Sequence, residues 1–175
     1  MSPASPPPQK PDRRDRLIEP FDVDPYHARE KPKGAATCSE CGVVFRNGRW
    51  TAPAAGAAAD ADRPAAEETV VCPACRRVQD AYPAGWVTLS GAFVAGRRDE
   101  LIGLMRNEEA MERGEHPLNR IMAIEETEDA LTVTTTDVHL PQRIARAVER
   151  AYGGELEIKS EPDEHRVRAS WRRDD

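Results

Sequence analysis

Two Cys-x-x-Cys pairs constrain this chain more than any other feature of its sequence. Cys38 and Cys41 form the first pair, Cys72 and Cys75 form the second, and 30 residues separate them. A two-residue spacing lets a tight turn direct both sulfurs at one ion, and two such pairs complete a tetrahedral site of four sulfurs. Gly42 supplies the positive-φ freedom that such a turn often needs. We therefore predict one structural metal ion held by these four cysteines.

Zinc is the ion that we expect, because structural zinc ribbons are the commonest use of this pattern. Iron in a rubredoxin-like site uses the same geometry, so the sequence does not exclude iron. Four sulfur ligands leave no open position for water, so the ion is expected to support folding and not catalysis. Disulfides are disfavoured because the first residues contain no secretion signal. The expected location is the cytoplasm, where the thiols stay reduced.

Composition divides the chain into a loosely packed first part and a compact second part. Charged residues make up 32% of the chain and hydrophobic residues 39%, with 15 prolines, which predicts that a sizeable part is not packed. Residues 1–33 are predicted to form a flexible, disordered tail, whose aromatic segment from Phe21 to Tyr26 is expected to dock on the protein itself. Residues 34–85 predict a zinc ribbon with four cysteine ligands. This ribbon is expected to have a strand-turn-strand core, a cysteine knuckle at each end and a low-complexity insert at about 51–66.

Residues 86–175 predict an α+β domain from their hydrophobic periodicity. We expect strands at about 86–93, 120–125 and 130–136, a helix at 99–113, a second helix that begins between 137 and 141 and ends at 153, and a hairpin of strands 155–159 and 166–172. Gly91 is expected to form a bulge in the first strand. The order is β-α-β-β-α-β-β, and its first six elements match a ferredoxin-like, split β-α-β sandwich.

Net charge limits the kinds of partner that the chain can bind. The formal net charge is −6, so any surface for nucleic acid must be local. Arginines beside an aromatic residue on the cysteine-rich part suit phosphate contact and base stacking, although Trp50 could instead pack over that part's core. Arginines three and four residues apart form a stripe on the second helix, a pattern that a solvated face would also give. The candidate contact residues are Arg46, Arg49, Trp50, Arg76, Arg77, Arg143, Arg146 and Arg150.

Other charged groups carry less weight. Arginines alternate along the last strand, and we expect cross-strand glutamates, with Glu157 facing Arg168, to neutralise them. The four histidines are scattered, and the sequence lacks a phosphate-binding loop, a nucleophile elbow and a zinc-protease signature. We therefore expect no enzymatic activity and no small-molecule substrate. No stretch approaches the roughly 18 apolar residues of a membrane-spanning helix, so no membrane association is expected.

Several short motifs carry a resemblance that covers about residues 36–173. They are Cys38-x-x-Cys41-Gly42, Gly48-Arg49-Trp50, Cys72-Pro-x-Cys75-Arg76, Tyr82-Pro-Ala-Gly85, Gly91-x-Phe93, Asn107-Glu108, Thr135-Thr136-x-x-x-Leu140 and Ala151-Tyr152-x-Gly154. With them the chain resembles a family of small uncharacterised bacterial zinc-ribbon proteins. It is more distantly similar to the N-terminal zinc region of nonsense-mediated-decay protein three, an adaptor that binds large ribosomal subunits, although that relative carries more cysteine pairs. The resemblance implies binding to RNA or to the ribosome.

These observations lead to one leading hypothesis and two alternatives. The leading hypothesis is a non-enzymatic zinc protein that binds RNA, with ribosomal RNA on the ribosome as the expected partner. The first alternative is an adaptor that joins protein partners through the zinc ribbon, the tail and an acidic area around Glu108 to Asp129. The second is a rubredoxin-like electron carrier with iron in the cysteine site.

Overall fold

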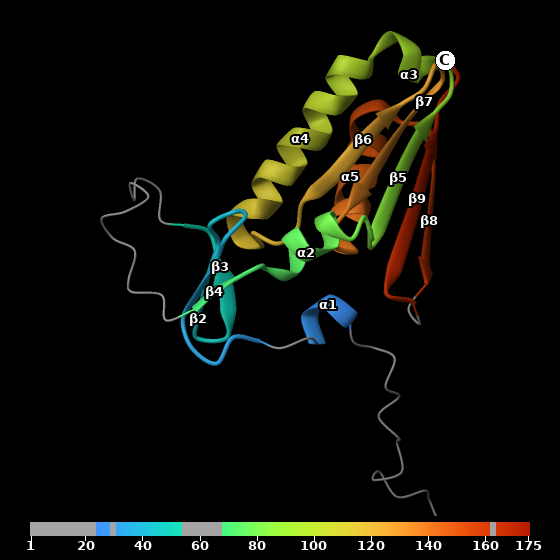
Figure 1. Cartoon of the computed structure of the whole chain (residues 1–175). Helices are drawn as coiled ribbons and strands as arrows, with labels where there is room; N and C mark the ends of the chain where they lie inside the picture. Colours follow the sequence, from blue (N-terminus) through green and yellow to red (C-terminus); the bar gives the residue numbers. More distant parts are fainter. Residues whose placement is uncertain (1–23, 29–30, 54–67, 162–163) are drawn as a thin grey trace, which may run out of the picture.

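The structure, a computed structural model, describes residues 24–28, 31–53, 68–161 and 164–175. It has a mixed α+β fold with two separate sheets, a small one before Cys72 and a larger one after Ala84 (Figure 1). The prediction of an α+β fold is confirmed. Residues 1–23 of the predicted tail and residues 54–67, most of the predicted insert, lie outside the described residues.

The first sheet and the helix that follows it hold the cysteines, and we call residues 36–79 the metal module. Its strands are β1 (Ala36–Cys38), β2 (Val44–Arg46), β3 (Arg49–Thr51) and β4 (Glu68–Val70), in the order β3-β2-β1-β4. Asn47 and Gly48 join β2 to β3 with φ values of 51° and 79°, which suit a two-residue turn with both residues at positive φ. β4 runs parallel to β1 and leads into helix α2 (Pro73–Gln79). The second cysteine pair therefore lies at the start of a helix, and the predicted strand-turn-strand ribbon is not confirmed.

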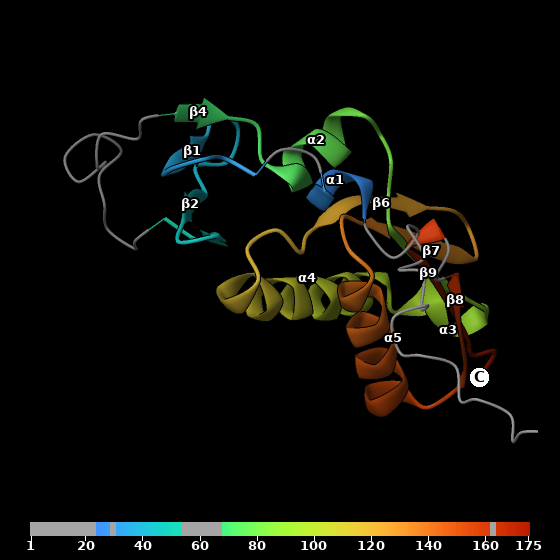
Figure 2. The ribbon, with the colours of Figure 1, turned by 90° about the horizontal axis from the view of Figure 1, so that it is seen from below.

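The second sheet forms the α+β domain, residues 85–172, together with three helices. Its elements are β5 (Gly85–Ser90), α3 (Ala92–Gly96), α4 (Arg98–Glu115), β6 (Ile121–Glu126), β7 (Ala130–Thr135), α5 (His139–Tyr152), β8 (Glu155–Glu161) and β9 (Arg166–Arg172). Helices α4 and α5 cover the same face of the sheet (Figures 1 and 2). Leu89, Leu101 and Trp171 are fully buried between these layers, so this domain has a continuous apolar core.

The strand order of the second sheet is β6-β7-β5-β9-β8. A ferredoxin-like sheet would place the strand that follows α5 next to β5. Here β9 lies parallel to β5, and β8 forms the edge of the sheet. The position next to β5, expected for β8, is therefore occupied by β9. The cross-strand pairing also differs from the prediction, because Arg168 lies opposite Lys159 and not opposite Glu157.

Local interactions explain where α5 begins and where β5 ends. The Asp137 carboxylate accepts hydrogen bonds from the backbone N–H groups of His139 and Leu140, at 2.6 and 3.0 Å, so α5 begins where predicted. The first strand is shorter than predicted: it ends before Gly91, whose φ of 105° turns the chain into α3. Phe93 therefore belongs to a helix, where its ring lies 5.9 Å from that of Trp171.

The segment that precedes the metal module docks on α2, as the sequence predicted. Asp24 forms an ion pair with Arg77, and helix α1 (Pro25–Ala28) packs against α2. The Tyr26 ring lies 4.4 Å from the Arg77 guanidinium, and its hydroxyl donates to Asp80 at 2.9 Å. Phe21, Asp22 and Val23 of the predicted docking segment lie outside the described residues.

Candidate metal centre and adjoining cleft

The four cysteines converge in the metal module. The Sγ atoms of Cys38, Cys41, Cys72 and Cys75 all lie within 4.8 Å of one another, and none of the four is in a disulfide. The sulfurs of Cys41 and Cys72 are 3.7 Å apart. Tetrahedral zinc with Zn–S bonds of about 2.3 Å requires sulfurs separated by about 3.8 Å. The cluster therefore has the composition and the size to hold one metal ion.

Local backbone structure brings the two pairs together. Cys38 ends β1, and a tight turn returns the chain, with Gly42 at φ 75° and its N–H 3.1 Å from the Cys38 carbonyl. Cys72 immediately precedes α2, where its sulfur accepts from the Cys75 N–H at 3.4 Å. The parallel pairing of Cys38 with Val70 then sets the turn beside the helix start. As predicted from the spacing, each pair presents two sulfurs to one centre.

Hydrogen bonds distribute negative charge within the cluster. The hydrogen bond with Cys72 lowers the pKa of Cys41 to about 4, which favours its thiolate form. The same bond, helped by burial, raises the pKa of Cys72. Burial also raises the pKa of Cys75, against the opposing effect of a hydrogen bond from Arg120. Since metal ions bind thiolates, an ion that enters the site displaces the protons that remain.

Arg120, from the α+β domain, completes the surroundings of the cysteines. Its guanidinium Nη2 lies 3.3 Å from the Cys75 sulfur and 3.6 Å from the Cys72 sulfur. Burial would lower the pKa of Arg120, but these sulfur contacts outweigh burial and raise it, so the side chain stays cationic. The sequence did not predict Arg120 as a site residue. Its neighbours in the sequence give no sign that it contacts Cys75 and Cys72, which precede it by 45 and 48 residues.

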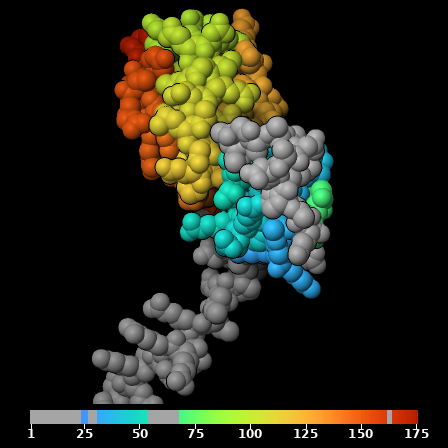
Figure 3. Space-filling model, turned by 90° about the vertical axis from the view of Figure 1, so that its left-hand side faces the viewer, coloured from blue at the N-terminus to red at the C-terminus, as the bar shows by residue number. Residues whose placement is uncertain are grey.

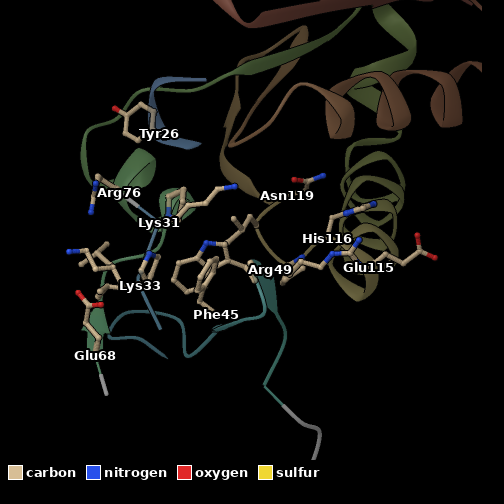
Figure 4. Close-up of a pocket in the computed structure, with 18 residues that line it drawn as sticks. Tyr26, Lys31, Lys33, Phe45, Arg49, Glu68, Arg76, Glu115, His116 and Asn119 are labelled. Carbon is tan, nitrogen blue, oxygen red and sulfur yellow. The ribbon is translucent and has the colours of Figure 1, made fainter. Parts of the chain in front are cut away.

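A cavity of about 1060 Å³ separates the metal module from the C-terminal end of α4, and we call it the basic cleft. Figure 3 shows the module directly below the yellow end of α4. In Figure 4, Lys31, Lys33 and Arg76 gather on one side of the cavity, opposite His116 and Asn119. Its lining also includes three aromatic rings, those of Tyr26, Phe45 and Trp50, and two carboxylates, Glu68 and Glu115. The cleft thus combines cations with flat apolar surfaces.

The cleft unites some of the predicted contact residues. Arg49, Trp50 and Arg76 line it. Trp50 packs over the core of the metal module, with its ring 5.2 Å from that of Phe45 and against the cysteine cluster, and it also borders the cavity. Arg46 is exposed on β2, directly across the hairpin from Arg49. The structure adds Lys31 and Lys33, which the sequence placed in the tail.

Other predicted contact residues have different roles. Arg77, predicted as a contact residue, is only 2% exposed and lies inside the protein; it donates to the Tyr82 carbonyl at 3.0 Å and pairs with Asp24. On α5, Arg143 binds Glu108 and Glu112 of α4, at 2.7 and 3.1 Å. Arg146 and Arg150 are exposed on α5, and none of the three α5 arginines lines the basic cleft.

Two glutamates of the predicted acidic area are buried on α4. Glu109 and Glu112 are each 8% exposed. Glu109 accepts from the Ile121 N–H at 2.8 Å, and Glu112 accepts from the Asn119 amide at 2.9 Å. Their charges therefore hold α4 against β6 and α5. Met111, on the same helix, is 56% exposed.

Three of the four histidines line one hollow of about 510 Å³, which the sequence did not indicate. They are His116, His139 and His165. Within the described residues, the cysteines are the only group of three or more metal-binding side chains whose ligand atoms lie within 4.8 Å of one another. The histidine hollow is therefore not assembled as a metal site.

Comparison with known proteins finds no family model, curated protein or solved structure that matches the chain. Among the described residues, no helix is both long enough and apolar enough to cross a membrane. The geometry of the cysteine cluster and of the cleft beside it is therefore the basis for assigning a function.

Proposed function

We propose that this chain is a non-enzymatic, zinc-binding protein of the cytoplasm that binds RNA in the basic cleft. The observation that carries the proposal is the position of the cleft, which lies directly against the cysteine cluster. Trp50 contacts the cluster on one side and borders the cavity on the other. One ion would thus organise both the fold of the module and the surface that meets RNA.

The metal part of the proposal is supported by the donor set. Four sulfurs at tetrahedral spacing suit zinc or iron, and they leave no position for a substrate. Zinc and iron are distinguished by colour, since an iron site of four sulfurs absorbs visible light and a zinc site does not. Protein purified under reducing, chelator-free conditions should be colourless and contain one zinc ion per chain. Protein that carries no metal under these conditions would contradict the proposal.

The RNA part is supported by the chemistry of the cleft lining. Lys31, Lys33, Arg49 and Arg76 supply positive charge to the cleft lining. Aromatic rings beside such cations suit bases that are unpaired and can stack. Because duplex RNA hides its base faces, single-stranded RNA is the expected ligand. A ribosome exposes such segments, and ribosomal RNA is the partner that we propose.

The rival hypothesis of an acidic adaptor surface is less well supported. Two glutamates of the acidic area, Glu109 and Glu112, bind groups inside the α+β domain, so their carboxylates are not available to a basic protein partner. Only the exposed carboxylates of that area, such as Glu125 and Glu128, remain for this role.

Binding to a labelled single-stranded RNA tests the RNA proposal directly. Arg49→Ala/Arg76→Ala should weaken binding and reduce the dependence of affinity on salt by about one unit of slope per lost phosphate contact. Trp50→Leu should cost about 1–3 kcal/mol of binding free energy through lost stacking. The matched control is Arg146→Ala/Arg150→Ala, which removes the same charge from α5 and should leave binding unchanged.

Two outcomes bear on the choice of partner. Co-sedimentation with ribosomes from the same host at moderate salt would support ribosomal RNA. No binding to any single-stranded RNA at low salt, where phosphate contacts are strongest, would defeat the RNA proposal.

A further inference from the structure

Arg120 joins the α+β domain, through its backbone, to the metal centre, through its side chain. Its backbone N–H donates to the Thr136 hydroxyl at 2.9 Å, and its carbonyl accepts from the Thr136 N–H at 2.9 Å. Its guanidinium reaches the sulfurs of Cys75 and Cys72. The backbone is thus fixed to the larger sheet while the charged end lies on the cysteine cluster.

The residues just before Arg120 form one wall of the basic cleft. His116, Leu118 and Asn119 all line the cavity. The Leu118 carbonyl accepts from the Thr136 hydroxyl at 2.6 Å, and its side chain packs against the cysteine cluster. The position of this wall relative to the module is therefore set by the contacts of Leu118 and Arg120 with the cluster.

Electrostatics makes the Arg120 contact sensitive to the metal. Four thiolates around a divalent ion leave the site with a net negative charge, and a charge-assisted N–H···S contact stabilises it. The guanidinium is half-buried, and its Nε atom is buried without a hydrogen-bond partner among the described residues. The sulfurs are therefore the main compensation for this charge. When metal loss unfolds the metal module, the sulfurs move away from Arg120, and a partly desolvated cation then favours moving out to water.

We propose that Arg120 is a positioning residue that couples metal occupancy to the shape of the basic cleft. The metal–thiolate cluster holds Arg120, and Arg120 holds the wall from His116 to Asn119 against the metal module. Metal loss releases this wall, so RNA binds tightly only to the metal-loaded protein. The last step rests on the proposed RNA function; the coupling between the cluster and the wall does not.

Metal affinity gives the first test, measured by competition with a chelator. Arg120→Met keeps the length of the side chain but removes its charge and donors, and should weaken zinc binding about 10- to 100-fold. Arg120→Lys keeps the charge but loses the planar fork that contacts two sulfurs, so its zinc affinity should be intermediate. Arg146→Met, on the exposed side of α5, is the matched control and should match wild type. Equal zinc affinity in all four proteins would overturn the proposal.

Hydrogen exchange of the cleft wall gives a second, independent test. In wild type, metal removal should speed exchange across residues 116–120, while residues 131–135 of β7 stay protected. In zinc-loaded Arg120→Met, exchange across 116–120 should already be fast. Should Arg120→Met fail to fold, Arg120→Lys serves instead, with an intermediate rate expected. If the hydrogen-exchange rate of residues 116–120 changes neither on metal removal nor on substitution of Arg120, the proposed coupling is overturned.

Titrations with a single-stranded RNA oligonucleotide separate this inference from the proposed function. Weaker binding by metal-free wild type and by zinc-loaded Arg120→Met supports both. If no protein binds RNA but the metal affinity and exchange change as expected, the RNA function fails and the coupling stands. If metal-free and metal-loaded wild type bind RNA equally well, the proposed control of the cleft by the metal is wrong.

Discussion

The metal module and the α+β domain achieve stability by different means. Fourteen buried residues form the core of the α+β domain, all of them apolar. The corresponding cluster in the metal module contains five buried residues, and three of them are metal-binding cysteines. Burial of apolar area can therefore stabilise the domain on its own, whereas the module buries too little and needs its ion.

This difference suggests a division of labour between the two regions. The α+β domain provides a rigid support, to which Thr136 fixes Arg120 and the cleft wall. The metal module provides the opposing wall with Arg49, Trp50 and Arg76. Substitutions that affect one region and spare the other are therefore the sharpest tests of the comparison.

Loss of a cysteine ligand should have the largest effect. Cys72→Ser removes one of four ligands, and structural zinc contributes on the order of 10 kcal/mol to small modules. We expect the region of residues 34–84 to unfold while the α+β domain stays folded, as judged by residue-resolved NMR. Ser39→Ala, next to a ligand but exposed, is the control and should fold normally. A folded module without zinc in Cys72→Ser would show that its core does not depend on the ion.

Loss of the buried arginine of α2 should have the next largest effect. Arg77→Met removes the buried ion pair between Arg77 and Asp24, and breaking such a pair typically costs about 3–5 kcal/mol. Urea denaturation of the zinc-loaded protein measures the loss. Arg77→Met/Asp24→Asn removes both charges and should recover part of it. No recovery in the double variant would mean that Arg77 acts through its contacts with Tyr26 and Tyr82 rather than through charge.

A cavity in the larger core should destabilise only the α+β domain. Leu89 is fully buried, and Leu89→Ala should cost about 2–5 kcal/mol of unfolding free energy. Zinc stoichiometry should stay at one per folded chain, because all four ligands lie in the metal module. Thr88→Ala, the neighbouring residue on the other face of β5, should change stability by about 0.5 kcal/mol or less. A loss of zinc in folded Leu89→Ala would contradict the separation of the two cores.

A pair of glycine substitutions should have the smallest effects, with opposite signs. Gly48→Ala forces alanine to a φ of 79° and should destabilise the β2–β3 turn by about 1 kcal/mol. Gly103→Ala places alanine in α4, where no atom crowds the new methyl group, and should stabilise by about 0.5–1 kcal/mol. Thermal unfolding of the zinc-loaded proteins measures both. Equal shifts in the same direction would show that backbone conformation is not the cause.

Short-range chemistry made much of this structure predictable. The Cys-x-x-Cys spacing identified the ligands because each pair needs only one tight turn. Asp137 and Gly153 marked the ends of α5 because capping is a local interaction. The dipeptide Asn47-Gly48 is an equally clear local signal for a hairpin, and both residues adopt positive φ in the turn.

Long-range geometry accounts for what the sequence did not reveal. Arg76 and Arg77 are indistinguishable as neighbours in the sequence, but a helix turns them about 100° apart, so one lines the cleft and the other is buried. Arg120 reaches the cysteines only because β6 starts beside them. The insertion of β9 between β5 and β8 is likewise a choice of sheet order that strand periodicity cannot encode.

Segment-resolved hydrogen exchange of the wild-type chain, before and after metal removal, tests the central claim most directly. The protein should contain one metal ion, and its removal should abolish protection across residues 36–46 and 68–79 while residues 85–90 and 166–172 stay protected. A chain that is purified without metal and still protects the metal module would contradict the claim that the ion holds this region and its cleft together.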